Sequence, residues 1–135
     1  MEPAKLLESA RDAMKRSYSI YSHFPVGAAV VSHDGRVFSA ANVENASFGL
    51  TICAERAAVA RMVAEAGFRT IVAVAVVAEK QPDVVPCGAC LQVLAEFGAP
   101  DCVVLGEDES GGISSRRLME FLPFAFNLGK PKTKS

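Results

Sequence analysis

Three of the four cysteines in this 135-residue chain have a spacing that could hold a metal ion. Cys87 and Cys90 form a C-x-x-C pair, and side chains three residues apart on a helix share one face, so both sulfurs could bind one zinc ion. We expect Cys53 and this pair to lie in the first turns of two helices, where free backbone N–H groups favour the thiolate form that zinc binds. Three protein ligands leave the fourth tetrahedral position open, which is typical of catalytic zinc.

Other arrangements of the cysteines remain open. Cys102 could supply a fourth thiolate and close a structural zinc site, and the C-x-x-C pair alone also fits a dithiol redox site. Cys102 lies in the apolar run CVVL, where a buried free cysteine behaves as a small apolar side chain. The histidines, His23 and His33, fall in a predicted loop and turn, and ordinary exposed positions explain both.

Glu55 and Arg56 follow Cys53 closely enough to act beside a metal. Zinc makes a bound water acidic enough to serve as a nucleophile near neutral pH, and a hydrolase needs a neighbouring group that takes the proton and passes it on. Glu55 could be that group, or simply an acid that favours a helix start. Arg56 could offset the negative charge of three thiolates around one Zn²⁺, or form an ordinary surface ion pair.

The first half of the chain has the periodicity of one helix and two strands. Apolar residues recur at three- and four-residue steps over 4–18, which predicts a helix of roughly four turns. Strands are expected over 25–31 and 36–41, joined by a turn at residues 33–35. The stretch NVENASFGL, at 42–50, is rich in Asn and Ser and predicts a polar loop.

Helices and strands alternate in the second half. Thr51 is the expected N-cap of a helix that is apolar around most of its circumference, and Gly67 and Gly98 are expected helix ends. The expected elements are a helix over 51–66, a strand over 70–78, a helix from PCGAC to Phe97, a strand over 102–105 and a short helix from Ser114 or Ser115 to Phe121.

This order predicts an α/β fold, a three-layer α/β/α domain over residues 1–128, followed by a polar basic tail over 129–135. Each crossover should be right-handed and should place its strand parallel to a neighbour, so that only the first hairpin need be antiparallel. The crossover from helix to strand to helix would return the chain to one edge of the sheet, where Cys53 could join Cys87 and Cys90.

Composition and charge limit the partners. The 14 basic and 15 acidic residues nearly balance and neither sign forms a long block, which disfavours nucleic acid. The longest apolar stretch, Thr70 to Ala78, is about half of the roughly 20 residues that a membrane helix needs. The N-terminal residues do not resemble a secretory signal, so we expect a cytoplasmic protein with reduced thiols.

The segments TICAER and PCGAC, separated by a predicted helix and strand, resemble the zinc-dependent cytidine deaminase family. Further agreement lies in YSHFPVGAAV, NVENASFGL, QVLAEFG and LMEFLPFAF, so that the resemblance covers nearly the whole chain. It implies a mixed five-stranded sheet and hydrolytic deamination of cytidine and 2′-deoxycytidine, which releases ammonia. The length and the three cysteines are similar to the small homotetrameric branch of the family.

The resemblance also implies roles for individual residues. Zinc would be held by Cys53, Cys87 and Cys90, while Glu55 would be the general acid and base, and Arg56 would balance the thiolate charge. The residues implied to contact substrate are Phe24, Asn42, Glu44, Ala54 and, from a neighbouring subunit, Phe126. Ala46 and Phe48 would lie near a subunit contact.

Leu91 departs from the family pattern, which usually has Arg directly after PCGAC. This leaves Arg56 with more of the charge balancing, and we expect either an altered acidity of the zinc-bound water or a local repacking. The substrate could instead be another aminopyrimidine nucleoside, such as an aminonucleoside antibiotic. A zinc-stabilised binding module without turnover is the alternative of a different class.

Overall fold

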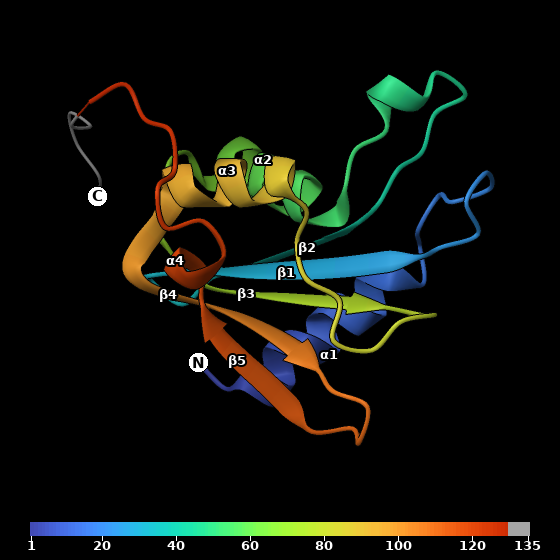
Figure 1. Cartoon of the computed structure of the whole chain (residues 1–135), viewed down its shortest axis with the longest axis horizontal. Helices are drawn as coiled ribbons and strands as arrows, with labels where there is room; N and C mark the ends of the chain where they lie inside the picture. The colour runs from blue at the N-terminus through green and yellow to red at the C-terminus, as the bar shows by residue number, and fades with distance from the viewer. Residues whose placement is uncertain (130–135) are drawn as a thin grey trace.

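The computed structural model describes residues 1–129, which fold around one five-stranded sheet (Figure 1). The strands are β1 (Val26–Ser32), β2 (Val37–Ala41), β3 (Ile71–Ala78), β4 (Gly98–Glu107) and β5 (Ile113–Arg117). They lie in the order β2-β1-β3-β4-β5. Neighbours β3 and β4 run parallel, whereas the other three neighbouring pairs are antiparallel, so the predicted mixed sheet is confirmed.

Helices cover both faces of the sheet. In Figure 1, α1 (Pro3–Met14) lies below the sheet, and α2 (Ala54–Ala66) and α3 (Gly88–Phe97) lie side by side above it. A short helix, α4 (Leu118–Phe121), follows β5 directly, and a 3-10 turn, η1 (Phe48–Leu50), lies in the segment that projects at the upper right. The predicted three-layer α/β/α fold is therefore confirmed.

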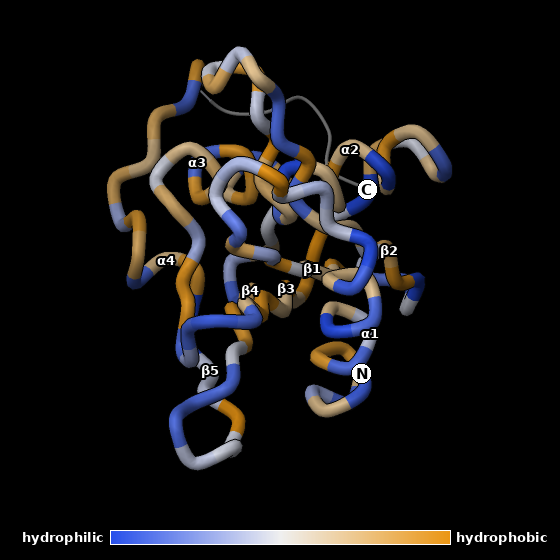
Figure 2. Tube along the Cα trace, turned by 90° about the vertical axis from the view of Figure 1, so that its right-hand side faces the viewer, coloured by the Kyte–Doolittle hydropathy of each residue, from blue (hydrophilic) through white to orange (hydrophobic). Residues whose placement is uncertain are grey.

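Strand β3 lies at the centre of the sheet and is buried on both faces. Its side chains alternate, with Val74 and Val76 packing under α2 and α3, and Ala73 and Ala75 packing against α1. A helix with one apolar stripe covers such a face, and Figure 2 shows hydrophilic and hydrophobic residues alternating along α1. This two-sided burial explains why the strand reads as one continuous apolar run.

Gly27 permits the close approach of α1 to the sheet. A Cβ atom at this position would lie 2.0 Å from the backbone oxygen of Ala10 and 2.8 Å from Cβ of Met14. Any larger residue would push the helix away from β1. Packing therefore requires glycine at position 27, and this glycine sets the distance between α1 and the sheet.

The structure corrects the predicted element boundaries at several places. The first helix ends at Met14, and Tyr18 instead pairs with Val43 in an isolated bridge. The predicted start of the last helix, at Ser114 or Ser115, is wrong because both residues lie in β5. The expectation that only the first hairpin need be antiparallel is incomplete, since β1 with β3 and β4 with β5 are also antiparallel.

Helix α2 begins later than predicted. Thr51 is not its N-cap, because Ile52 pairs with Val43 in a β-bridge that keeps this part of the chain extended. The helix starts at Ala54, with Cys53 as the N-cap residue, and the predicted end at Gly67 is confirmed. Gly67 has a φ of 74°, in the region that favours glycine.

The predicted tail over 129–135 lies, apart from Gly129, outside the described residues. The division of the chain into a domain over 1–128 and this tail stays a prediction. Within residues 1–129, no helix is long and apolar enough to cross a membrane.

Candidate active site

The N-termini of α2 and α3 bring the three predicted cysteines together. Cys53 and Cys87 are the N-cap residues of the two helices, and Cys90 lies in the first turn of α3. Their Sγ atoms all lie within 4.8 Å of one another. Since a zinc–sulfur bond is about 2.3 Å, two ligands of one ion lie at most about 4.6 Å apart, so these thiols fit zinc with little movement.

Cys102 lies apart from this cluster, in the core beneath α2 and α3, where it is 1% exposed. Burial raises the pKa of its thiol to about 12. Among the described residues, the group that could hold a metal contains three cysteines and leaves Cys102 out. A closed site with four thiolates is thus not what the fold builds.

The cluster contains thiols with opposite pKa shifts. The backbone N–H of Cys90 lowers the pKa of the exposed Cys87, as expected for a thiol at a helix N-terminus. Burial raises the pKa of Cys90 well above its ordinary value, with the nearby Glu55 carboxylate adding to the shift. A divalent cation supplies the positive charge that converts such a thiol to a thiolate.

Arg56 lies against the sulfurs from the side of α2. Its Nη2 donates a hydrogen bond to Sγ of Cys53 at 3.5 Å, and its contacts with Cys53 and Cys90 raise the pKa of the guanidinium. Its Nε is buried and has no hydrogen-bond partner among the described residues. The guanidinium is therefore placed to balance thiolate charge.

Glu55 is the first-turn acid of α2 and is 5% exposed. Burial raises the pKa of its carboxyl. Three smaller effects lower this pKa: a hydrogen bond from its own backbone N–H, a hydrogen bond with the side chain of Cys90, and the positive charge of Arg56. A carboxyl whose pKa is raised toward neutral can both accept and return a proton, as a general acid and base must.

A cavity of about 370 Å³ opens beside the cluster. The residues of the predicted site that line it are Phe24, Asn42, Glu44, Cys53, Ala54, Glu55 and Cys87. Among the described residues, the remaining wall is apolar apart from Ser22 and Thr51, and the lining contains no Lys or Arg. The cavity can thus accept a small ligand with an apolar ring and a few polar groups, and it offers nothing to neutralise an anion.

Asn42 is held rigidly in the cavity wall. Its Oδ1 accepts hydrogen bonds from the hydroxyl of Ser17 and the N–H of Val26, and its Nδ2 donates to the carbonyl of Phe24 at 3.1 Å. An amide nitrogen carries two hydrogens, so one donor of Asn42 remains for a ligand.

Glu44 is held in the same way by the loop before β1. Its Oε1 accepts the N–H groups of Tyr21 and Ser22, at 2.9 and 3.1 Å, and its Oε2 accepts the hydroxyl of Ser22. The Ser22 hydroxyl is the main cause of the lowered pKa of Glu44. The carboxylate keeps acceptor capacity for a ligand beside the free donor of Asn42.

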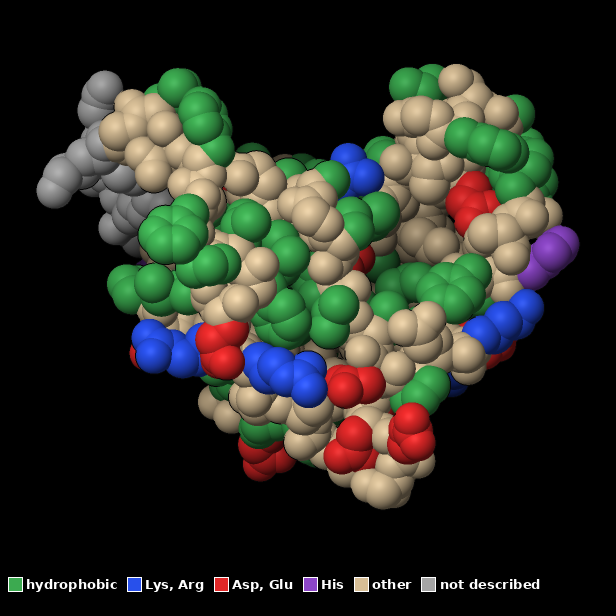
Figure 3. Space-filling model, in the orientation of Figure 1, with side chains coloured by type: hydrophobic (Ala, Val, Ile, Leu, Met, Phe, Trp, Pro, Cys, Tyr) green, Lys and Arg blue, Asp and Glu red, His purple; other side chains and the backbone are tan. Residues whose placement is uncertain are grey.

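The three residues expected near other subunits do not line this cavity, although Phe48 lines an adjoining cavity with Ser22, Glu44 and Thr51. Phe126 is 70% exposed, and its carbonyl accepts a hydrogen bond from Nε2 of Gln92. Phe48 is 73% exposed on the projecting segment, and Ala46 beside it is also exposed. Figure 3 shows hydrophobic side chains gathered on that upper-right projection.

The sequence-based reading missed Ser22 and Thr51 in the cavity wall and misplaced the helix starts. Cys53 and Cys87 are N-cap residues, where first-turn positions were expected. Leu91, in the first turns of α3, is buried in the core, and whether its presence alters the acidity of the zinc-bound water or the local packing stays a prediction.

Comparison with known proteins identifies the family. The model of the cytidine and deoxycytidylate deaminase zinc-binding region matches residues 1–106. The chain belongs to this family. Zinc is accordingly its cofactor, and the Cys53, Cys87 and Cys90 cluster is the group of residues in the described chain that fits the ion.

Individual deaminases match over most of their length. A cytidine deaminase from Halalkalibacterium halodurans is 45% identical over 126 residues, which cover 93% of this chain and 95% of that protein. A blasticidin-S deaminase from Bacillus cereus is 32% identical and covers 90% of each protein. The crystal structure of a cytidine deaminase from Burkholderia pseudomallei superposes with a TM-score of 0.85 at 44% identity, covering 93% of this chain and 100% of that one.

Proposed function

We propose that this zinc deaminase hydrolyses cytidine and 2′-deoxycytidine to uridine and 2′-deoxyuridine, with release of ammonia. The observation that carries the proposal is the cluster of Cys53, Cys87 and Cys90 beside a buried Glu55, in the wall of a cavity that fits a nucleoside. The relatives named cytidine deaminase support the same substrate.

Zinc held by Cys53, Cys87 and Cys90 would lower the pKa of a water molecule, so that the deprotonated water could act as the nucleophile toward C4 of the base. Glu55 takes a proton from this water and delivers one to N3 of the ring, and then helps to protonate the departing amino group. Its raised pKa suits both directions of transfer. In sum, one water is consumed, and the carbonyl of uridine and one ammonia are formed.

The other cavity residues bind and orient the nucleoside. Phe24 and the backbone of Ala54 contact the base, while a ribose hydroxyl accepts the free N–H of Asn42 and donates to Glu44. The carboxylates of Glu44 and Glu55, with no Lys or Arg among the described residues of the lining, disfavour a substrate that carries a phosphate. The cavity thus favours the nucleoside over the nucleotide.

The working enzyme is a homotetramer whose neighbouring subunits complete each active site. The exposed apolar side chains of Phe48 and Phe126, and the exposed face of α2 around Val63, support this assembly. In it, Phe126 reaches the site of a neighbour, and Ala46 and Phe48 lie at the contact. The cytoplasm, where thiols stay reduced, is the compartment that suits this site.

The proposal is tested by following the loss of absorbance of cytidine and deoxycytidine with and without a chelator. We expect turnover of both nucleosides that stops when zinc is removed and returns when zinc is restored. A panel with cytidine monophosphate and blasticidin S compares the alternative substrates. The proposal would be contradicted if the zinc-loaded protein turned over neither cytidine nor deoxycytidine. A strong preference for blasticidin S would identify the antibiotic as the substrate instead.

A further inference from the structure

Ser22 joins two parts of the cavity wall, Glu44 and the backbone of Phe24. It precedes β1 in the loop that carries Phe24, and it lines the cavity together with Glu44. Its hydroxyl donates a hydrogen bond to Oε2 of Glu44 and accepts the N–H of Phe24 at 3.0 Å. One hydroxyl thus links the residue proposed to bind ribose with the residue proposed to contact the base.

The loop around Ser22 is held in an unusual backbone conformation. His23 has a φ of 57°, a left-handed conformation that is uncommon for a residue other than glycine, and its N–H bonds to the carbonyl of Ser19. The tight turn directs the N–H groups of Tyr21 and Ser22 to the same carboxylate oxygen, Oε1 of Glu44. Glu44 consequently has fixed partners on both oxygens.

We propose that Ser22 is a positioning residue, whose hydroxyl holds the Glu44 carboxylate so that its remaining acceptor site faces a ribose hydroxyl of the substrate. This inference rests on the proposed function. A carboxylate offers about four acceptor sites, and three are filled by the loop, so the direction of the fourth is set by the other three. Without the Ser22 hydroxyl, Oε2 can rotate or bind water, and the ribose hydroxyl loses an aligned partner.

The alternative is that Ser22 only shapes the loop through its hydrogen bond with the N–H of Phe24. Loss of this bond would weaken the binding of ligands with and without ribose hydroxyls alike. The two roles differ in which ligands they affect. The informative ligands are uridine and 2′,3′-dideoxyuridine as competitive inhibitors of cytidine turnover, because they share the base and differ in the ribose hydroxyls.

The experiment compares Ser22→Ala, Ser22→Thr and the wild type, with Ser19→Ala as a control from the same loop whose hydroxyl has no hydrogen bond among the described residues. For Ser22→Ala we expect about a tenfold weaker binding of uridine and a KM for cytidine raised by a similar factor, with kcat nearly unchanged. Binding of 2′,3′-dideoxyuridine should stay within about twofold of the wild-type value, and Ser22→Thr should restore the binding of uridine.

A second measurement tests the path through Glu44. In a Glu44→Ala background, Ser22→Ala should have no further effect on the binding of uridine, because the group it positions is gone. If Ser22→Ala fails to fold, Ser22→Thr and Ser22→Val provide an isosteric pair with and without the hydroxyl. Equal losses for uridine and 2′,3′-dideoxyuridine, or additive effects of the two substitutions, would overturn the inference. A wild-type protein that does not deaminate cytidine would instead overturn the proposed function.

Discussion

Arg56 is the cation that the structure places against the thiols. Its Nη2 lies 3.5 Å from Sγ of Cys53, and the residue after Cys90, where the family usually has Arg, is the buried Leu91. Arg56→Gln should therefore weaken zinc binding or lower kcat by about 10- to 100-fold, the range typical of groups that support metal ligands. Metal analysis and cytidine turnover measure the two effects.

Arg61→Gln is the matched control for Arg56. Arg61 lies on the same helix, but it pairs with Glu65 at the surface, with Nε 2.6 Å from Oε2, and its Nη1 donates to the carbonyl of Ser39. The control should keep its zinc and its turnover. Equal behaviour of the two variants would show that Arg56 contributes only a general positive charge.

The four thiols should differ in reactivity once zinc is removed. Thiolates react with alkylating agents, and Cys87 is exposed with a lowered pKa, whereas Cys102 is buried with a pKa raised to about 12. Iodoacetamide in the presence of a chelator should label Cys87 first and Cys102 last, which mass spectrometry of the peptides can follow. Zinc should protect Cys87 from the reagent.

Cys102→Ala should keep one zinc per chain. Loss of zinc in Cys102→Ala would support the closed four-thiolate site instead.

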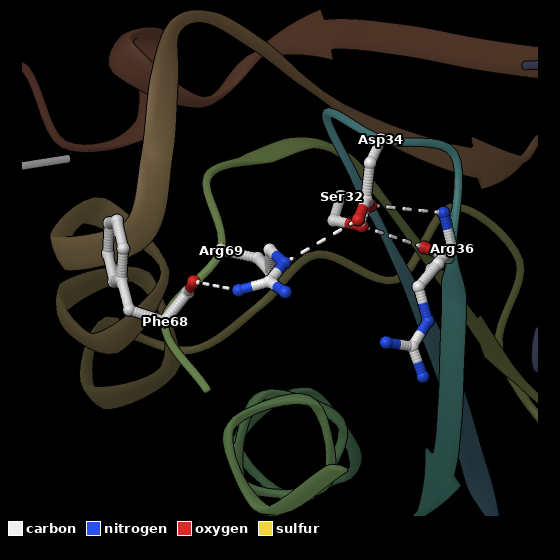
Figure 4. Close-up of polar contacts among 5 residues, drawn as sticks. All are labelled: Ser32, Asp34, Arg36, Phe68 and Arg69. Carbon is white, nitrogen blue, oxygen red and sulfur yellow. Dashed lines mark hydrogen bonds and ion pairs between the residues drawn. The ribbon is translucent and has the colours of Figure 1, made fainter. Parts of the chain in front are cut away.

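At the scale of elements, the β1–β2 hairpin is tied to the connection between α2 and β3 (Figure 4). Asp34 in the turn accepts the hydroxyl of Ser32, and its Oδ2 lies 3.5 Å from Nε of Arg69, whose Nη1 donates to the carbonyl of Phe68 at 2.8 Å. The hydrogen bond from Ser32 is the main cause of the lowered pKa of Asp34. These contacts join the turn between β1 and β2 to the segment that leads into β3, the other neighbour of β1.

The lowered pKa of Asp34 determines how its contribution to the free energy of unfolding depends on pH. The folded Asp34 binds a proton less readily than the unfolded one, whose pKa is 3.8, so its stabilisation is complete above that pH and is lost as the pH falls through the folded value. Asp34→Asn should be less stable than the wild type at pH 7, and the difference should shrink on going to pH 3. Urea unfolding at both pH values measures it, and a difference that grows at low pH would contradict this account.

The predictability of the elements depended on how deeply they are buried. The order of the elements up to β4 followed from periodicity, because β3 and the helices that cover it must bury continuous apolar faces. The sequence ISSRR, by contrast, has no such face, since β5 is an edge strand that pairs only with β4 and is largely exposed. The extension of β4 back to Gly98 was missed for a similar reason, because Pro100 and Asp101 are exposed.

The metal ligands of the site could be predicted from the sequence, whereas the residues that hold its other side chains in place could not. Cys53, Cys87, Cys90 and Glu55 are close neighbours in sequence or share a helix start, so their proximity could be predicted from topology. Ser22 acts through a tertiary contact across 22 positions, and nothing in its local sequence indicates a partner. The roles of the individual side chains in binding and catalysis stay predictions until they are measured.

At the scale of the whole molecule, the fold of a single chain does not explain why several large apolar side chains are exposed. Helix α2 has apolar residues around most of its circumference, yet Val63 is 42% exposed, and Phe48, Phe124 and Phe126 are exposed far more. Apolar surface of this kind marks a protein–protein interface. Assembly would cover the helix face that the sheet leaves open.

The assembly has a direct test. Light scattering at micromolar concentration should give the mass of a tetramer, and Val63→Glu should shift it toward smaller species, because a charge in a buried interface is costly. Activity should fall together with assembly, because we propose that Phe126 of a neighbouring subunit completes each site. Lys5→Glu, which changes an exposed residue of α1, is the control. A monomeric wild type with full activity would contradict both the tetramer and the role of Phe126.

The central claim is that zinc held by the three cysteines and proton transfer by Glu55 together carry out the deamination of cytidine. Glu55→Gln tests it most directly, because the amide has nearly the same shape and cannot exchange protons. The variant should retain one zinc per chain, while its kcat for cytidine falls by about 10²- to 10⁴-fold or more, since Glu55 acts in more than one proton transfer. Near-normal turnover by a zinc-loaded Glu55→Gln enzyme would contradict the account.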